Sequence, residues 1–214
     1  MVGLASMLLV GCSAIWRPVP KTEYHVSVSS FGNSPYPPGV TFVIQPADPS
    51  LSKDDPEFQE YASYLQGVLE QKGFKLAANA SAADFEATLN YGMGDPSTRV
   101  TSADSGGFGY AWTRNLATYN SRTSYAYDTT FQRTCQVVAY DLAERRTKGQ
   151  WKQVWRTQMV SVGHSSDLRT VFPILLAAGY NFLGQDSYQQ QQIVIYDDDP
   201  AVERVRGALK PPMP

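Results

Sequence analysis

Ser50 and Lys53 have the S-x-x-K spacing in which a lysine can activate a serine hydroxyl as a nucleophile. That chemistry needs the serine at the start of a buried helix, with S-D-N and K-T-G motifs elsewhere in the chain. Here the pair lies in a segment bounded by Pro49 and Pro56, and neither partner motif occurs in the sequence. The spacing is therefore interpreted as coincidental.

His164 and an aspartate run at residues 197–199 are the other polar groups placed where chemistry could occur. His164 lies between a predicted strand and a predicted helix, and with His25 as the other histidine a histidine metal site would need an improbable geometry. The aspartates follow an apolar strand and could offer oxygen ligands to Ca²⁺ or Mg²⁺. However, adjacent strand residues point to opposite faces, and the glycine-punctuated spacing of a calcium loop is absent. We therefore predict a solvated strand exit that caps the last helix, with no metal and no cofactor.

The segment 94–130 alternates aromatic residues with glycine, serine and threonine, and carries arginines beside them. Aromatic residues and arginine are enriched at binding hot spots, and tyrosine offers a large contact area at small entropic cost. One hypothesis is a binding surface for a protein or a sugar ring, and the other is a β-hairpin whose cross-strand tyrosines partly cover the sheet. The candidate binding residues are Tyr110, Trp112, Arg114, Tyr119, Arg122, Tyr125 and Tyr127.

Cys12 follows a short apolar run, residues 2–11, in the order Leu9-Val10-Gly11-Cys12. The run is too short to cross a bilayer and has the length of the apolar part of a signal peptide, although the first positive charge comes only at Arg17. This order resembles the lipobox of bacterial lipoproteins, which implies acylation (palmitate included) of Cys12 after removal of residues 1–11. Ser13 after the cysteine implies the periplasmic face of the outer membrane.

The composition limits the partners and the disulfide bonds that the rest of the chain can have. Eighteen basic and twenty acidic residues give a formal charge of −2, which argues against a nucleic-acid partner. With Cys12 acylated, Cys135 is a lone thiol and no internal disulfide can form. We expect a lipidated tether at 12–38, a single α/β domain at 39–209 that contains the insert 94–130, and a tail at 210–214.

Local patterns predict the elements of that domain. The strongest helix signal begins with Asp55 as cap and Pro56 at the first position, and ends at Gly73. Pro173 is awkward inside the second predicted helix, which must either begin near Thr170 or kink. We expect strands at 40–44, 85–93, 130–142, 150–162 and 192–196, helices at 55–73, 166–182 and 200–209, and an exposed charged connection at 143–149. The order β-α-β-insert-β-β-α-β predicts a mixed sheet packed by two main helices.

Several short motifs occur in an order similar to that of the bacterial lipoprotein family known as the DUF4136 group. In that family a helix ends at Gly-Phe, Ala-Asp opens the next strand, and a Val-Trp strand precedes the second helix. The resemblance covers residues 24–184 without the insert and implies a compact periplasmic α/β domain without assigned catalytic residues. The matching motifs are residues 61–65 with Gly73-Phe74, Ala83-Asp84-Phe85, Val154-Trp155 and Phe172-Pro173.

Three functional hypotheses follow. The first is a non-catalytic binding module, anchored under the outer membrane, that binds an envelope protein or peptidoglycan. The second is a structural or assembly subunit of an envelope complex. The third is a periplasmic hydrolase that uses His164 with a serine or aspartate brought close by folding. The oligomeric state is left open by the sequence.

Overall fold

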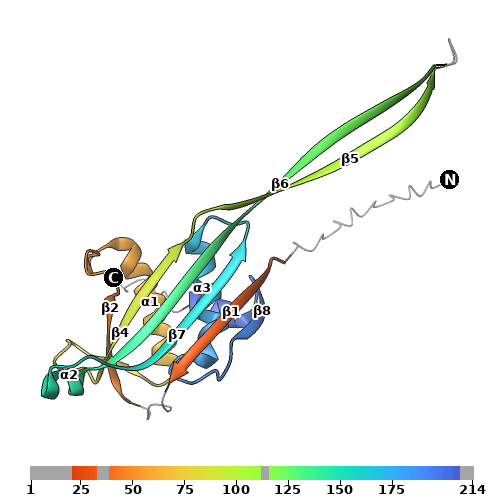
Figure 1. Cartoon of the computed structure of the whole chain (residues 1–214). Coiled ribbons are helices and arrows are strands. Elements are labelled where there is room, and N and C mark those ends of the chain that lie inside the picture. The colour runs from red at the N-terminus through yellow and green to blue at the C-terminus, as the bar shows by residue number, and fades with distance from the viewer. Residues whose placement is uncertain (1–20, 33–38, 112–115, 208–214) are drawn as a thin grey trace, which may run out of the picture.

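The computed structural model describes residues 21–32, 39–111 and 116–207, except for the side chains of residues 106–122. Figure 1 shows a body of sheet and helices, with one long hairpin that projects from it. The strands are β1 (Glu23–Gly32), β2 (Thr41–Pro46), β3 (Lys75–Leu76), β4 (Phe85–Met93), β5 (Ser97–Ala111), β6 (Leu116–Asp141), β7 (Lys152–Gly163) and β8 (Gln191–Tyr196). The helices are α1 (Pro56–Gln71), α2 (Leu142–Lys148), α3 (Leu168–Gly179) and α4 (Pro200–Arg206), with a 3₁₀ turn η1 (Tyr180–Phe182).

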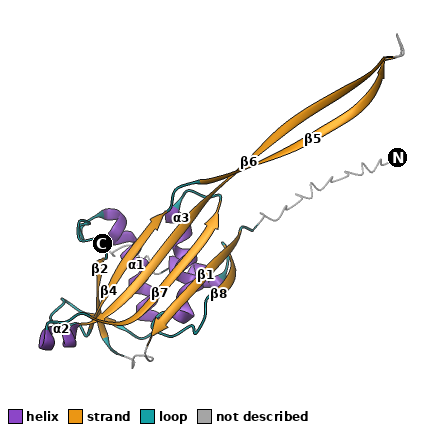
Figure 2. Ribbon diagram, viewed as in Figure 1, coloured by secondary structure: helices purple, strands orange, loops and turns teal. Residues whose placement is uncertain are grey.

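The sheet has the order β3-β2-β4-β6-β7-β1-β8, and β5 pairs with β6 alone. β2 runs parallel to β3 and β4, whereas the remaining pairs are antiparallel. In Figure 2 the helices α1 and α3 lie on one face of this sheet. The prediction of a single mixed α/β domain is confirmed. No helix among the described residues is long and apolar enough to cross a bilayer.

The sequence signals of α1 act as expected. Asp55 accepts a hydrogen bond from Phe58 N at 3.0 Å and so satisfies an otherwise unpaired donor of the first turn. Gly73 has φ +92°, a conformation that an L side chain rarely adopts, and its N–H bonds to Glu70 O at 2.9 Å. The helix therefore ends where the glycine lies, and its apolar stripe faces the sheet.

Helix α3 begins before its proline and continues through it. Asp167 caps it by accepting from Thr170 N at 3.2 Å, and Pro173 lies inside the helix. Of the two alternatives, a start near Thr170 or a kink, the start near Thr170 is therefore wrong, because the helix begins at Leu168. All residues from Val171 to Gly179 are buried. Burial of apolar side chains, at roughly 1.5–3 kcal/mol for each large one, offsets the backbone hydrogen bond that proline cannot make.

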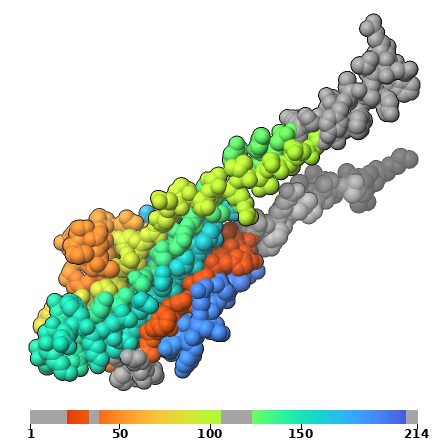
Figure 3. All heavy atoms as spheres, in the orientation of Figure 1, coloured from red at the N-terminus to blue at the C-terminus, as the bar shows by residue number. Residues whose placement is uncertain are grey.

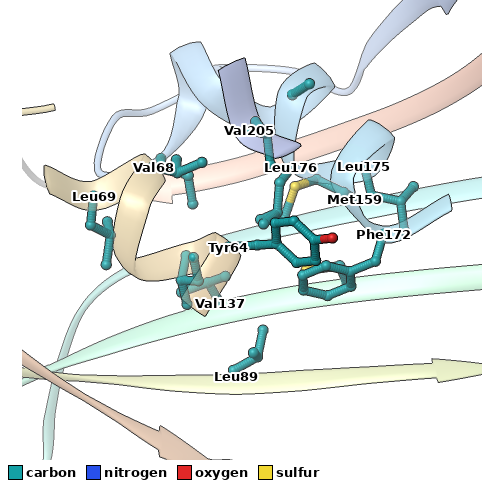
Figure 4. Packing of buried hydrophobic residues seen from close by; sticks show 14 of the residues in the cluster. Tyr64, Val68, Leu69, Leu89, Val137, Met159, Phe172, Leu175, Leu176 and Val205 are labelled. Carbon is teal, nitrogen blue, oxygen red and sulfur yellow. The ribbon is translucent and has the colours of Figure 1, made fainter. Parts of the chain in front are cut away.

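The core fills the space between the helices and the covered face of the sheet. Figure 4 shows side chains from α1, α3 and α4 meeting those from β4, β6 and β7. Cys135 lies among them and is fully buried, as its place beside Val137 and Ala139 predicts. The labelled residues are Tyr64, Val68, Leu69, Leu89, Val137, Met159, Phe172, Leu175, Leu176 and Val205.

The expected tether at 12–38 is wrong for residues 23–32, which form β1. This strand lies between β7 and β8, and its Val26 and Val28 are fully buried under the helices. Prolines at 18 and 20 favour an extended link, but the residues that follow them alternate between apolar and polar, which indicates a strand. The domain therefore begins before residue 39.

Two smaller expectations also change. The charged connection at 143–149 is largely a short helix, α2, capped by Asp141, whose carboxylate accepts from Glu144 N at 3.0 Å. The last helix, α4, ends at Arg206 rather than at residue 209. The strands predicted at 85–93 and 192–196 and the pairing of 130–142 with 150–162 are confirmed by β4, β8 and the ladder between β6 and β7.

Candidate binding surface

The insert forms a two-stranded antiparallel arm that consists of β5 and the outer part of β6, residues 116–130. Its register runs from Ser97 opposite Thr130 to Ala111 opposite Leu116. The ladder between β6 and β7 starts only at Phe131 opposite Gly163, so the arm begins where β6 leaves the sheet. Figures 1 and 3 show the arm standing out from the body. The insert is thus a hairpin, as one hypothesis held, but it does not cover the sheet.

The described part of the arm exposes large side chains on one face. Val100 lies opposite Tyr127 and is 54 % exposed, while Tyr127 and Tyr125 are 71 % and 62 % exposed. These residues occupy alternate positions, which place them on the same side of the ribbon. Tyr125 lies opposite Ser102, so these tyrosines do not face another aromatic residue across the ladder. The surface is available for contact with another molecule.

The structure places the other candidate residues only in part. Tyr110 lies in β5, and Tyr119 and Arg122 lie in β6, at backbone positions farther out along the arm. Trp112, Arg114 and Cys12 lie outside the described residues. Tyr125 and Tyr127 are therefore the two candidates whose exposure is established.

A buried arginine that the sequence prediction missed lies at the root of the arm. Arg133 is 1 % exposed, and its guanidinium donates to Ser161 Oγ at 3.1 Å and to Ser165 O at 3.3 Å. A Cβ at Gly163 would lie 2.6 Å from its Nη2, so the glycine leaves the space that the guanidinium fills. Burial lowers the pKa of Arg133, and the ring of Tyr24 lies 5.9 Å from its Cζ. Arg133 shares the inward positions of Cys135 and Val137, and that alternation was the signal available in the sequence.

His164 also lies at the root of the arm. Its Nε2 is 2.6 Å from Asp128 Oδ1, and the two side chains are 77 % and 56 % exposed. The pair is consequently open to water and joins the arm to the loop before α3. The serine of the S-x-x-K spacing is elsewhere, where Ser50 Oγ donates to Asp48 Oδ1 at 2.7 Å in the loop before α1. Ser50 thus lies away from His164. Of the serine or aspartate that the hydrolase hypothesis places beside His164, the structure provides the exposed Asp128.

The aspartate run has separate structural partners. Asp199 caps α4 by accepting from Ala201 N at 2.7 Å, as predicted. Asp198 lies 2.7 Å from Lys21 Nζ, and Asp197 accepts from Thr22 N at 3.2 Å. Across residues 21–32, 39–111 and 116–207 no group of three or more histidine, cysteine or acidic side chains is arranged to hold a metal ion.

A second missed feature is an open hollow of about 540 Å³ between the first turns of α1 and α3. Glu60 and Arg169 line it and form an ion pair, with Nε and Oε1 2.7 Å apart. Tyr61 also lines it, and burial raises the pKa of its hydroxyl. The positive charge of Arg169 in the hollow is thus neutralised by the carboxylate of Glu60.

Comparison with known proteins gives little further guidance. No family model matches the chain, and no curated protein matches it. The resemblance to the DUF4136 group therefore stays a prediction. Among solved structures, a PDZ domain protein from Parabacteroides distasonis superposes with a TM-score of 0.42 at 9 % identity, over 82 % of this chain. The match spans 38 % of that protein, and its likeness is too low to carry an argument.

Proposed function

We propose that this protein is a non-catalytic lipoprotein of the outer membrane, facing the periplasm, that binds another component of the envelope through its arm. Acylated Cys12 anchors the chain, and the segment up to residue 20 links the anchor to β1. The α/β body holds the arm in a fixed direction. The arm supplies the contact surface.

The observation that carries this proposal is the exposure of Val100, Tyr125 and Tyr127 on a ribbon in which β5 pairs with β6 alone among the described strands. An isolated two-stranded hairpin is at best marginally stable in water. Covering the large aromatic side chains on it would be energetically favourable. Such an arm is therefore suited to contact with a second surface.

The root of the arm supports the same conclusion. Arg133 ties β6 to the end of β7 and to the loop before α3, and the pair of His164 with Asp128 adds a second link. These contacts hold the direction of the arm relative to the body. A contact element on a rigid base loses less conformational entropy when it binds.

Site-specific photo-crosslinking in living cells tests the proposal. A photoreactive amino acid replaces Tyr127 on the arm, and in the control it replaces Tyr188, which is 95 % exposed on the body. We expect adducts from the arm position that are several-fold more abundant than from the control. Mass spectrometry of the same protein should show an acylated cysteine at the amino terminus. Equal labelling at the two positions, or an unmodified Cys12, would overturn the proposal.

A further inference from the structure

The two margins of the sheet differ in how they are protected. One margin is β3, which has two residues, Lys75 and Leu76, and the other is β8. Very short edge strands and lysines on them are devices by which proteins prevent pairing with another chain. β8 has six residues and contains no charge, proline or glycine. In Figure 1 it lies beyond β1, and β1 is the one described strand that pairs with it. β8 is therefore an open edge without these protective features.

The backbone of β8 presents hydrogen-bonding groups to its open side. Asp197 N donates to Thr22 O at 3.1 Å, so the odd-numbered residues of β8 direct their N–H and C=O groups toward β1. The even-numbered residues, Gln192, Val194 and Tyr196, direct theirs to the open side. A further strand beside β8 can pair with these outward groups, as in the addition of a strand to an exposed sheet edge.

The side chains of β8 are sorted between the two faces of the sheet. Ile195 belongs to the core, and Ile193 packs against it. Val194 and Tyr196 point to the face without helices and are 52 % and 40 % exposed. Opposite residues of neighbouring strands stabilise a sheet best when apolar side chains meet. A suitable partner strand therefore carries alternating apolar residues, as β8 itself does.

We propose that β8 pairs with β8 of a second copy of this chain, antiparallel and about a two-fold axis at Val194. In this register Ile193 lies opposite Ile195 of the second copy, and Gln192 lies opposite its Tyr196. Val194 lies opposite its own counterpart, so its N–H and C=O bond to that residue in both directions. Tyr196 N–H donates to Gln192 O of the other copy. The outward groups of one copy thus meet those of the other, as a self-complementary two-fold interface requires.

The charges around β8 favour this orientation. The aspartate run 197–199 follows the strand, and the glutamine run 189–192 leads into it. In the antiparallel register each aspartate run lies beside the glutamine run of the other copy, whose amides can donate hydrogen bonds to carboxylates. A parallel pair would place the two aspartate runs side by side, and like charges opposite each other destabilise a sheet. The edge is consequently complementary to a reversed copy of itself. This pairing does not involve the arm or the anchor.

Disulfide formation between copies tests the register. Each variant is the full chain with Cys12→Ser, and Cys135 is buried, so the introduced cysteine is the reactive thiol. Val194→Cys should give linked dimers under mild oxidation, because a hydrogen-bonded opposite pair has its Cα atoms about 5.5 Å apart, a distance that a disulfide spans. Val162→Cys is the matched control, since Val162 is 60 % exposed on the interior strand β7. We expect several-fold more dimer from residue 194 than from residue 162.

A pair of further variants fixes the axis. Gln192→Cys and Tyr196→Cys should each give little dimer alone, because residue 192 lies opposite residue 196 and not opposite itself. The two variants should form a linked dimer when they are mixed. Equal yields from residues 194 and 162, or a mixture that gives no more dimer than its separate components, would overturn the proposed pairing.

Association without a covalent bond is measured by analytical ultracentrifugation of the Cys12→Ser chain. Its average mass should rise with concentration toward twice the monomer value. Val194→Arg places like charges on the axis and should keep the protein monomeric, whereas Val162→Arg should not change the association. A chain that stays monomeric without either arginine would overturn the pairing and leave the proposed function standing. Circular dichroism of each variant confirms that the body is folded.

Discussion

Arg133 occupies an energetically costly position, because its guanidinium is buried and its Nε has no hydrogen-bond partner among the described residues. Replacement by alanine removes the bonds to Ser161 and Ser165 and leaves a cavity. We expect Arg133→Ala to lower the free energy of unfolding by about 2–3 kcal/mol in urea titrations. Arg99→Ala, at an exposed position on the arm, is the matched control and should change it by less than about 0.5 kcal/mol. Equal effects would show that Arg133 does not stabilise the root.

Ser30 joins β1 to the segment between α3 and β8. Its hydroxyl lies 2.7 Å from Thr157 Oγ1 and 2.7 Å from Gln185 O, in a buried site. Ser30→Ala leaves these groups short of a partner, and we expect a loss of about 1–3 kcal/mol in thermal or urea unfolding. Ser29→Ala, one residue earlier on the opposite face, is the control. A neutral Ser30→Ala would mean that the network is replaceable.

The thiol of Cys135 should be inert in the folded protein. Complete burial raises its pKa, and the thiolate is the reactive form. We expect no modification by a maleimide at pH 8 under native conditions and full modification in denaturant. Labelling at similar rates in the two conditions would contradict the burial of this side chain.

At the scale of elements, Asp84 links the parallel strands β2 and β4. It accepts from the backbone N–H and the hydroxyl of Thr41, each at 2.8 Å, and these bonds hold the pKa of Asp84 below its ordinary value of 3.8. Its stabilising contribution is therefore present above the unfolded pKa and is lost as the pH falls through the lower folded pKa. In urea unfolding between pH 2 and pH 6, Asp84→Asn should flatten the acid limb of the stability profile, whereas Asp54→Asn should not.

The sequence predicted the elements that carry strong local signals. Asp55, Pro56 and Gly73 delimit α1, and Asp167 and Asp199 cap the helices that follow them. β1 is hard to recognise from the sequence although Tyr24, Val26 and Val28 alternate, because the polar residues His25 and Ser27 separate them and prolines precede them. Which strands become neighbours depends on contacts between distant residues, so the order of the sheet could not be predicted from local patterns.

The candidate surface was recognised by its composition and not by its shape. Aromatic, glycine and serine residues at 94–130 fitted both a covering hairpin and a free one. The outcome depends on where β6 leaves the sheet, and no local pattern encodes that point. Arg133 was missed because a charged residue at an inward position is uncommon, although its alternation with Cys135 indicated burial.

At the scale of the whole molecule, the described residues of the arm add no side chain to the core cluster. Replacement of residues 97–130 by a short Asn-Gly turn should therefore leave the body folded. We expect the free energy of unfolding to change by less than about 1 kcal/mol, while the yield of envelope adducts in chemical crosslinking should fall several-fold. Unfolding of the shortened protein would show instead that the arm is part of the folding unit.

One uninterrupted strand, β6, forms both a central member of the sheet and half of the arm. Its neighbours β4 and β7 pair with it along most of its inner length. A pull on the arm along its axis would therefore load many interstrand bonds together in shear, rather than opening them one after another. The body can thus serve as a mechanical anchor, resisting tension in the direction in which a sheet is strongest.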